Sequence, residues 1–476
     1  MTHAVPAPQL LIGGELRGAS GGGTFPIIDP ATGDVIGHAP DAGDADTAAA
    51  IAAARRACGQ PGWADAPQFR AHCLRQLKAA LEEDFEVLRE ITIAEAGVPR
   101  MWTDGPQLRI PVDGLGYLTG LLESYQWEQD LGVAAPMGIK TARRVRREPA
   151  GVVAAITPWN LPLHQIVVKV VPALAAGCTV VLKPAELTPL TAFELARALA
   201  SAGFPAGVFN LVTGGGRDVG GQLVRSPHVD HVSFTGSTAV GRQVAAAAAG
   251  TVKGLTLELG GKSASVVLSD VPDELFATAV KVTVANCFLN GGQTCTALSR
   301  LIVPASRLAQ AGELAAAAAA RYVPGERLGP LISAGQREKV ESFLAPGLAR
   351  AVTAAVELPA RGYYVPPTVY SDVEPGSRLA QEEIFGPVLS ILAADSDEHA
   401  IELANDSIYG LGGALWTGDP GGALDWAARI RAGQVDVNGA PFNPRAPFGG
   451  YRQSGIGREI GDYGIGDVLE VKAVQL

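Results

Sequence analysis

GVVAAITPWNLPLHQIVVKVVPALAAGCTVVLKPAE (residues 151–186) holds two short β-branched runs with a longer apolar segment between them. The runs at 152–157 and 179–184 have the length and composition of buried strands, and Gly177 ends the helical segment that separates them. A strand, a helix and a second strand in this order predict a βαβ crossover with parallel strands. This stretch therefore predicts an α/β fold.

The same alternation continues along the chain. Strand-like runs follow at 208–214 and 231–236, and a second series starts at 263–268, continues at 300–304 and extends to about residue 440. Two such series predict two doubly wound, Rossmann-like parallel-sheet domains. The strand-like segments TARRVRRE (141–148) and DVLEVKAVQL (467–476) lie outside both series, so we expect them to form a small separate β excursion.

Composition excludes several classes of protein. With 47% hydrophobic and 18% charged residues, the chain is typical of a compact globular protein. Its net charge of −10 gives no general attraction for nucleic acid or an anionic membrane, so we expect neither as a partner. The five cysteines form no CxxC pair, and the N-terminus lacks a signal-peptide pattern. We therefore expect a soluble cytoplasmic protein without disulfides or a metal site.

Ligands of doubly wound sheets bind beyond the carboxyl ends of the strands, at the point where the strand order reverses. Three segments directly follow predicted strands, namely TPWN (157–160), KPAE (183–186) and TGS (235–237). Gly236 and Gly241 flank the last turn, where a helix N-terminus and an open backbone favour a pyrophosphate. Glycine there is as often part of an ordinary tight turn, so both interpretations stay open.

Lys183 and Glu186 have two interpretations each. Lys183, at the end of a strand, can reach a ribose hydroxyl or a phosphate, or it can be a solvated loop lysine. Glu186 can accept a hydrogen bond from a ribose 2′-hydroxyl, or it can stabilise the start of the next helix. Neither residue decides the function alone.

A cysteine and a glutamate further along the chain are candidates for chemistry. FLNGGQTCTALSR (288–300) places Cys295 in a polar, glycine-rich segment, either as a packing residue or as a reactive thiol. Glu258 lies in the apolar run LTLELGGK (255–262), either satisfied by backbone amides or acting as a base with a raised pKa. A thiol and a base are the two members of a covalent mechanism, which favours the reactive interpretation of both.

Six motifs occur in the order found in the NAD(P)-dependent aldehyde dehydrogenases, which the chain resembles from about residue 10 to its end. They are KPAE, FTGSTAVG, LELGGK, GQTC (292–295), EEIFGP (382–387) and PFGGYRQSGIGRE (447–459). The resemblance implies an enzyme that oxidises an aldehyde to the acid through a cysteine thiohemiacetal and thioester. It further implies an NAD-binding domain (1–128 and 148–257), a catalytic domain (258–455) and oligomerisation segments (129–147 and 456–476).

The resemblance also implies roles for individual residues. Cys295 is similar to the nucleophile, and Glu258 to the base that activates the thiol or the deacylating water. Asn160 resembles the amide that forms an oxyanion hole with the backbone N–H of Cys295. Lys169 resembles a lysine of a proton route from the base, and Asp462 stands where many members carry a glutamate of that route.

NAD is the expected cofactor, because the carboxylate of Glu186 would repel the 2′-phosphate of NADP. The residues that the resemblance assigns to cofactor binding are Ile156, Thr157, Pro158, Trp159, Lys183, Glu186, Gly236, Ser237, Gly260, Glu383 and Phe385.

The identity of the aldehyde depends on the wall of the substrate tunnel. Leu161, His164 and Phe448 are the expected substrate-binding residues. The candidates for the whole wall are mostly apolar, which predicts an apolar or aromatic aldehyde; they are Trp159, Leu161, His164, Phe288, Phe442 and Phe448. An inward-pointing Arg445 would instead favour a semialdehyde or another acid-bearing aldehyde, since guanidinium binds carboxylate bidentately.

Two further alternatives concern the reaction itself. A CoA-acylating dehydrogenase is disfavoured, because members of that branch generally lack the base at the Glu258 position. A non-enzymatic use of the fold is disfavoured by the presence of both Cys295 and Glu258. We expect a homodimer or homotetramer, because the β excursion pairs with a partner's sheet in this family.

Overall fold

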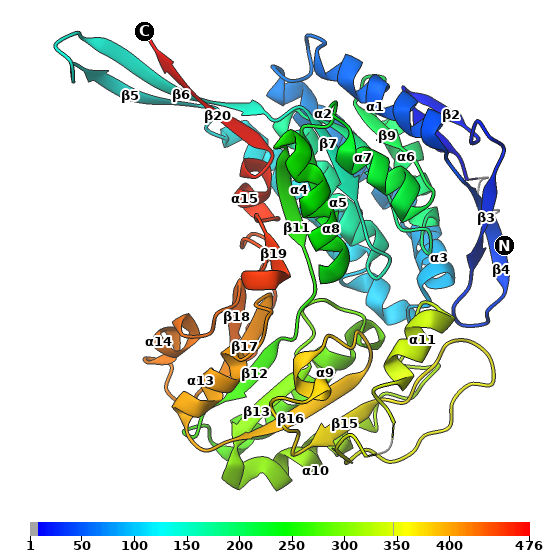
Figure 1. Cartoon of the computed structure of the whole chain (residues 1–476), viewed down its shortest axis with the longest axis vertical. Coiled ribbons are helices and arrows are strands. Elements are labelled where there is room, and N and C mark those ends of the chain that lie inside the picture. Colours follow the sequence, from blue (N-terminus) through cyan, green and yellow to red (C-terminus); the bar gives the residue numbers. More distant parts are fainter. Residues whose placement is uncertain (1–7, 346) are drawn as a thin grey trace.

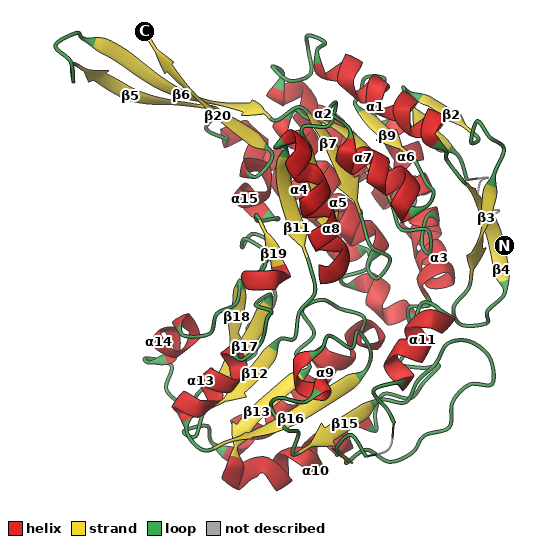
Figure 2. Cartoon of the chain, in the orientation of Figure 1, coloured by secondary structure: helices red, strands yellow, loops and turns green. Residues whose placement is uncertain are grey.

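The computed structural model describes residues 8–345 and 347–476, so the first seven residues of the predicted NAD-binding domain lie outside the described part (Figure 1). Two large sheets with surrounding helices form the body, and a narrow three-stranded sheet projects from it (Figure 2). The α/β class with Rossmann-like domains is confirmed by this architecture and by the solved structures compared below.

The first sheet has eight strands in the order β19-β11-β10-β7-β8-β9-β1-β2. Its five central strands, from β11 to β9, are parallel, and the outer ones are antiparallel to their neighbours. Its strands are β1 (Leu10–Ile12), β2 (Glu15–Arg17), β7 (Val152–Ile156), β8 (Thr179–Lys183), β9 (Phe209–Leu211), β10 (His231–Thr235), β11 (Gly254–Glu258) and β19 (Gly455–Ile456).

Both faces of this sheet are covered, which explains the continuous apolar runs of its strands. Val153 and Ala155 of β7 belong to one buried cluster, while Val152 and Ala154 belong to another on the opposite face. The helices of this part are α1 (Asp44–Cys58), α2 (Pro67–Glu83), α3 (Phe85–Ala96), α4 (Arg109–Ser124), α5 (Pro162–Ala176), α6 (Leu190–Ser201), α7 (Gly221–Arg225), α8 (Thr238–Ala248) and α15 (Gly461–Gly466).

The strand order reverses between β7 and β10. From β7 the chain moves outward through β8 and β9, then returns to the other side of β7 to form β10 and β11. The turns after β7 and β10 therefore lie side by side at the carboxyl edge, which is where doubly wound sheets bind ligands.

The second sheet has seven strands in the order β14-β15-β16-β13-β12-β17-β18, all parallel except β14. Its strands are β12 (Ala264–Val267), β13 (Arg300–Pro304), β14 (Arg350–Ala351), β15 (Thr368–Ser371), β16 (Val388–Ala394), β17 (Gly412–Trp416) and β18 (Gln434–Val437). Its helices are α9 (Asp273–Phe288), α10 (Leu308–Ala319), α11 (Ala334–Glu341), α12 (Arg378–Gln381), α13 (Asp397–Asn405) and α14 (Ala423–Ala428).

The projecting sheet consists of β5 (Glu128–Ala134), β6 (Thr141–Pro149) and β20 (Leu469–Gln475), in the order β20-β6-β5 (Figure 1). Its apolar side chains Leu131, Val133 and Val471 are more than half exposed. A separate hairpin, β3 (Thr24–Ile28) with β4 (Val35–Pro40), completes the described strands. Within residues 8–345 and 347–476, no helix is long and apolar enough to cross a membrane.

Candidate active site

A cleft opens at the carboxyl edge of the first sheet, where the switch point between β7 and β10 faces the second sheet. The predicted residues that line it are Pro158, Trp159, Asn160, Gly236, Ser237, Gly260, Cys295, Glu383 and Phe385. Thr235, which belongs to the predicted segment TGS (235–237), also lines it, and three residues that the sequence analysis missed, Leu259, Gln336 and Lys339, complete the wall. The fold thus gathers the turns of four motifs, far apart in the chain, around one thiol.

Cys295 lies in the loop between α9 and β13, where its side chain is only partly exposed. Burial, and after it the negative charges of Glu258 and Glu383, raise the pKa of its thiol to about 12. The thiol is therefore protonated at neutral pH in the free protein, and a reaction through it needs a base or a positive charge in the cleft.

Asn160 follows β7 and shares the cleft with Cys295. Its side-chain Nδ2 donates to the backbone carbonyl of Gln293 at 2.8 Å, two residues before the thiol. An amide carries two N–H donors, so one holds the nucleophile loop and the other remains for a ligand. This arrangement suits an oxyanion hole.

Glu258 ends β11 and is 2% exposed. Neither of its carboxylate oxygens has a hydrogen-bond partner among the described residues. Burial, and then the negative charge of Glu459, raise its pKa well above the usual range, against the opposing effect of Lys169. A carboxyl group in this condition keeps its proton to a higher pH than an exposed glutamate does, which suits a general base.

Lys169 of α5 forms a buried ion pair with Glu459, whose Oε1 also accepts from Ser233 at 3.3 Å. Asp462, which stands where many members carry a glutamate of the proton route, accepts instead from the hydroxyl of Tyr117 at 2.7 Å. The sequence analysis missed Glu459 although it ends the last motif, because the sequence alone does not show that it lies against Lys169. A search for an acid to neutralise a buried lysine would have found it.

Of the predicted cofactor residues, Gly236 and Ser237 line the cleft, whereas Lys183 and Glu186 do not. The Nζ of Lys183 donates to the carboxylate of Glu186 at 3.1 Å, and burial lowers the pKa of the lysine. Ser237 caps α8 by accepting from the N–H of Val240 at 3.3 Å. A Cβ at Gly236 would lie 2.4 Å from the Phe234 ring, so this turn excludes larger residues. The helix N-terminus is thereby open to an anion.

Ile156 and Thr157 lie at the end of β7 and do not line the cleft. Ile156 pairs in register with Lys183, and the backbone N–H of Thr157 donates to the Lys183 carbonyl at 3.1 Å. Through these contacts both residues hold the end of β8, which carries Lys183, beside the turn that carries Trp159. Their contact with a cofactor stays a prediction.

Glu383 and Phe385 bring the second sheet to the cleft. The carboxylate of Glu383 accepts from the backbone N–H of Gly261 at 2.9 Å, and a Cβ at Gly260 would lie 2.4 Å from it. Phe385 has a positive φ of 61°, rare for an aromatic residue, and packs edge-on against Trp159 with ring centroids 5.4 Å apart. Gln336 and Lys339, one helical turn apart on α11, have no sequence signal that marks them.

The expected substrate residues do not line this cleft. Leu161 is the N-cap residue directly before α5 and is 8% exposed, while Phe448 pairs with Glu459 through two backbone hydrogen bonds. Burial lowers the pKa of His164 to about 4, and its Nδ1 has no partner in the described part. Their contact with a substrate stays a prediction.

Two expectations about the tunnel wall have clear outcomes. Phe288 was wrong as a tunnel residue, because its side chain is fully buried in the core and packs edge-on against Tyr322. Arg445 is exposed, and its guanidinium lies 5.1 Å from the centre of the Tyr117 ring. The cation–π contact accounts for this arginine without an acidic ligand.

Known proteins resemble this chain over nearly its whole length. Residues 17–474 match the family model described as the aldehyde dehydrogenase family. The chain belongs to the aldehyde dehydrogenase family. The predicted family and enzyme class are thereby confirmed.

Relatives of this aldehyde dehydrogenase cover nearly its whole length. A 3-succinoylsemialdehyde-pyridine dehydrogenase from Pseudomonas sp is 41% identical over 98% of this chain and 98% of its own. A geranial dehydrogenase from Castellaniella defragrans is 39% identical, with the same coverage. A mutant aldehyde dehydrogenase C from Pseudomonas syringae, solved with NAD+ and octanal, matches with a TM-score of 0.93 at 40% identity, covering 99% of this chain and 98% of that chain.

Proposed function

We propose that this protein oxidises an aldehyde to the carboxylic acid, with NAD as cofactor and a thioester on Cys295 as the intermediate. The observation that carries the proposal is the cleft that gathers Cys295 and Asn160 with the turn of Gly236 and Ser237. It combines a nucleophile, an amide donor and an anion-binding helix N-terminus in one place.

The first half of the reaction is addition of the Cys295 sulfur to the aldehyde carbonyl. The free N–H of Asn160 and the backbone N–H of Cys295 donate to the oxyanion that forms. One such donor is worth about 3 kcal/mol of barrier. NAD+, when bound, supplies the acceptor for the hydride and a positive charge that favours the thiolate.

The second half is hydrolysis of the thioester. Glu258 takes a proton from water, and its raised pKa makes it an effective base near neutral pH. The ion pair of Lys169 and Glu459, which acts electrostatically on Glu258, offers a path by which that proton leaves the site. The presence of this base supports transfer to water over transfer to CoA.

The residues present fit NAD. The turn at Gly236 leaves no room for a side chain, so backbone can approach a pyrophosphate at the start of α8. Lys183 and Glu186 can hold ribose hydroxyls by donating and accepting. The hydroxyl of Thr235, which lines the cleft and has no partner among the described residues, offers one more contact.

We expect Glu186 to exclude NADP. Its carboxylate, joined to Lys183 at 3.1 Å, would meet the 2′-phosphate as a like charge. Changing Glu186→Ser should raise kcat/KM for NADP by about tenfold relative to NAD, a shift of about 1.4 kcal/mol. The measurement is kcat/KM for both cofactors with one aldehyde. Equal values for the two cofactors in the unchanged protein would refute this role.

The proposed substrate is a medium-sized apolar or aromatic aldehyde. The exposed position of Arg445 and the octanal bound in the P. syringae relative support it. A semialdehyde is the second candidate, because the Pseudomonas sp relative is named for such a substrate.

A panel of aldehydes with NAD, followed by NADH absorbance, tests the proposal. We expect kcat/KM for benzaldehyde and hexanal to exceed that for succinic semialdehyde by about tenfold, the scale of one or two lost apolar contacts. A tenfold advantage for the semialdehyde would establish the second candidate. No NADH from any aldehyde would overturn the proposed function.

We further propose a homo-oligomer in the cytoplasm. The exposed apolar residues of the β20-β6-β5 sheet support the homo-oligomer, since a two-fold interface can bury them against a second copy.

A further inference from the structure

We infer that Gln107 is a positioning residue for the oxyanion donor and the nucleophile loop, an inference that rests on the proposed function. Gln107 lies in the short connection between the 3-10 helix η1 (Arg100–Asp104) and α4, and its side chain is completely buried. It does not line the cleft, so it acts only through the groups that it holds.

The side-chain amide of Gln107 joins two segments of the active site. Its Nε2 donates to the backbone carbonyl of Asn160 at 3.0 Å and to Oδ1 of Asn290 at 3.1 Å. A backbone carbonyl can only accept, so this contact fixes which end of the amide faces Asn160. Both N–H donors of Gln107 are therefore used on the active site.

Asn290 connects Gln107 to the loop that carries the nucleophile. Its Nδ2 donates to the Asn160 carbonyl at 2.8 Å and to the Gln293 carbonyl at 3.4 Å. The same Gln293 carbonyl accepts from the side chain of Asn160. Gln107, Asn160 and Asn290 thus form a closed buried network that ends two residues before Cys295.

The loop before Cys295 needs such a support because its backbone is strained. Asn290, Gly291 and Gly292 all have positive φ, of 55°, 66° and 75°. A left-handed asparagine costs of order 1 kcal/mol and persists only where its surroundings hold it. The side chain of Asn290 accepts from Nε2 of Gln107 and donates to the backbone carbonyl of Asn160. Two groups outside the loop therefore hold Asn290 in its left-handed conformation.

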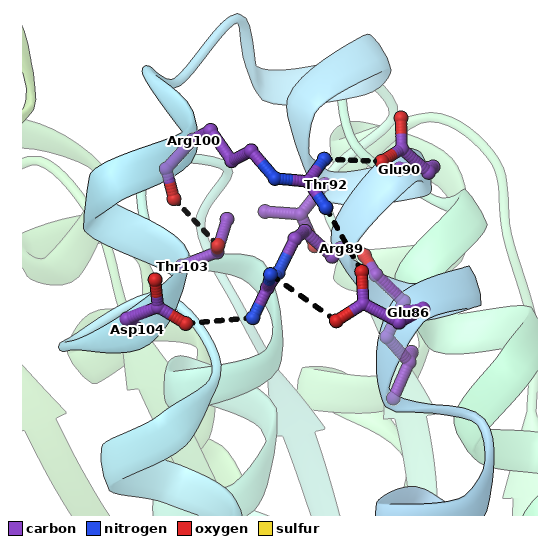
Figure 3. Close-up of polar contacts among 8 residues, drawn as sticks. Glu86, Arg89, Glu90, Thr92, Arg100, Thr103 and Asp104 are labelled. Carbon is purple, nitrogen blue, oxygen red and sulfur yellow. Dashed lines mark hydrogen bonds and ion pairs between the residues drawn. The ribbon is translucent and has the colours of Figure 1, made fainter.

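An ion-pair cluster fixes the segment that presents Gln107 (Figure 3). Arg89 of α3 joins Asp104 of η1 at 2.6 Å, and Arg100 of η1 joins Glu86 of α3 at 2.9 Å. The Arg89 side chain is 12% exposed and that of Asp104 is 62% exposed, so solvent screens this pair mainly from the Asp104 side. The cluster ties η1 to α3, three residues before Gln107.

The test compares Gln107→Leu and Gln107→Glu with the unchanged enzyme. Leucine removes both donors, and we expect kcat/KM for the aldehyde to fall by about 10- to 100-fold, the cost of misplacing a catalytic group by about 1 Å. Cofactor affinity, measured by quenching of tryptophan fluorescence with NAD, should stay unchanged. Thr103→Val is the control, because Thr103 is equally buried four residues earlier but donates only to the Arg100 carbonyl (Figure 3).

Two readouts separate positioning from general loosening. Alkylation of Cys295 by iodoacetamide forms no oxyanion, so its rate should change far less than aldehyde oxidation. In Gln107→Glu the loss relative to the unchanged enzyme should shrink as pH falls, because the protonated carboxyl regains one donor; in Gln107→Leu the loss should not depend on pH in this way.

The outcomes are distinct. An active unchanged enzyme whose Gln107 variants are equally active overturns the inference, and so does a parallel fall of oxidation, alkylation and NAD binding. An unchanged enzyme that oxidises no aldehyde overturns the proposed function instead.

Discussion

Replacing Cys295 with alanine is expected to reduce aldehyde oxidation by about 10⁴-fold or more, the usual consequence of removing a covalent nucleophile. No other described cysteine can take its place. Cys73, Cys178 and Cys287 are buried, and none of them lines the cleft that contains Cys295. The measurement is NADH formation at an enzyme concentration high enough for one NADH per enzyme molecule to be detected.

The matched control is Cys58→Ala. Cys58 is as partly exposed as Cys295, but it lies at the end of α1, away from the cleft. This variant should keep its activity, while Cys295→Ala should still bind NAD with unchanged affinity. Substantial turnover in Cys295→Ala would remove the covalent mechanism.

Glu258→Gln is expected to slow steady-state turnover by about 10²- to 10⁴-fold, the range for loss of a general base. Glutamine keeps the shape of the side chain and cannot take a proton from water. The first turnover of each enzyme molecule should still produce NADH, because hydride transfer precedes the hydrolysis step that needs water. A burst of NADH followed by a slow phase is the expected signal.

The pH dependence follows from the raised pKa of Glu258. The base works only when deprotonated, so kcat of the unchanged enzyme should rise with pH through that pKa, and the rise should be absent in Glu258→Gln. Because the folded pKa exceeds the unfolded one, the unchanged protein loses stability as pH rises between them. The neutral glutamine avoids this loss, so a lower melting temperature of the variant at high pH would contradict the assignment.

The parallel sheets and the residues after their strands could be predicted from the sequence. The run at 300–304 is a strand with the predicted bounds, and the turn that carries Asn160 directly follows β7. These features depend on local patterns, namely β-branched runs and the glycines that end them. The divisions between domains stay predictions, although β11 ends at Glu258 and β12 begins at Ala264.

The remaining site residues depend on contacts between distant parts of the chain. Gln336 and Lys339 lie on a short helix with ordinary helical composition, and only the approach of the second sheet brings them to the cleft. Glu459 becomes significant only when Lys169 is buried against it. Gln107 has no motif at all, because its role comes from the two acceptors that the fold places beside it.

The most direct test of the central claim is the intact mass of Glu258→Gln, quenched with acid shortly after mixing with NAD and hexanal. Without the base, the acyl group should remain on the enzyme, so the mass should rise by one hexanoyl group. Peptide mapping should then locate it on Cys295. An NADH burst with an unmodified mass, or an acyl group on another residue, would contradict the account.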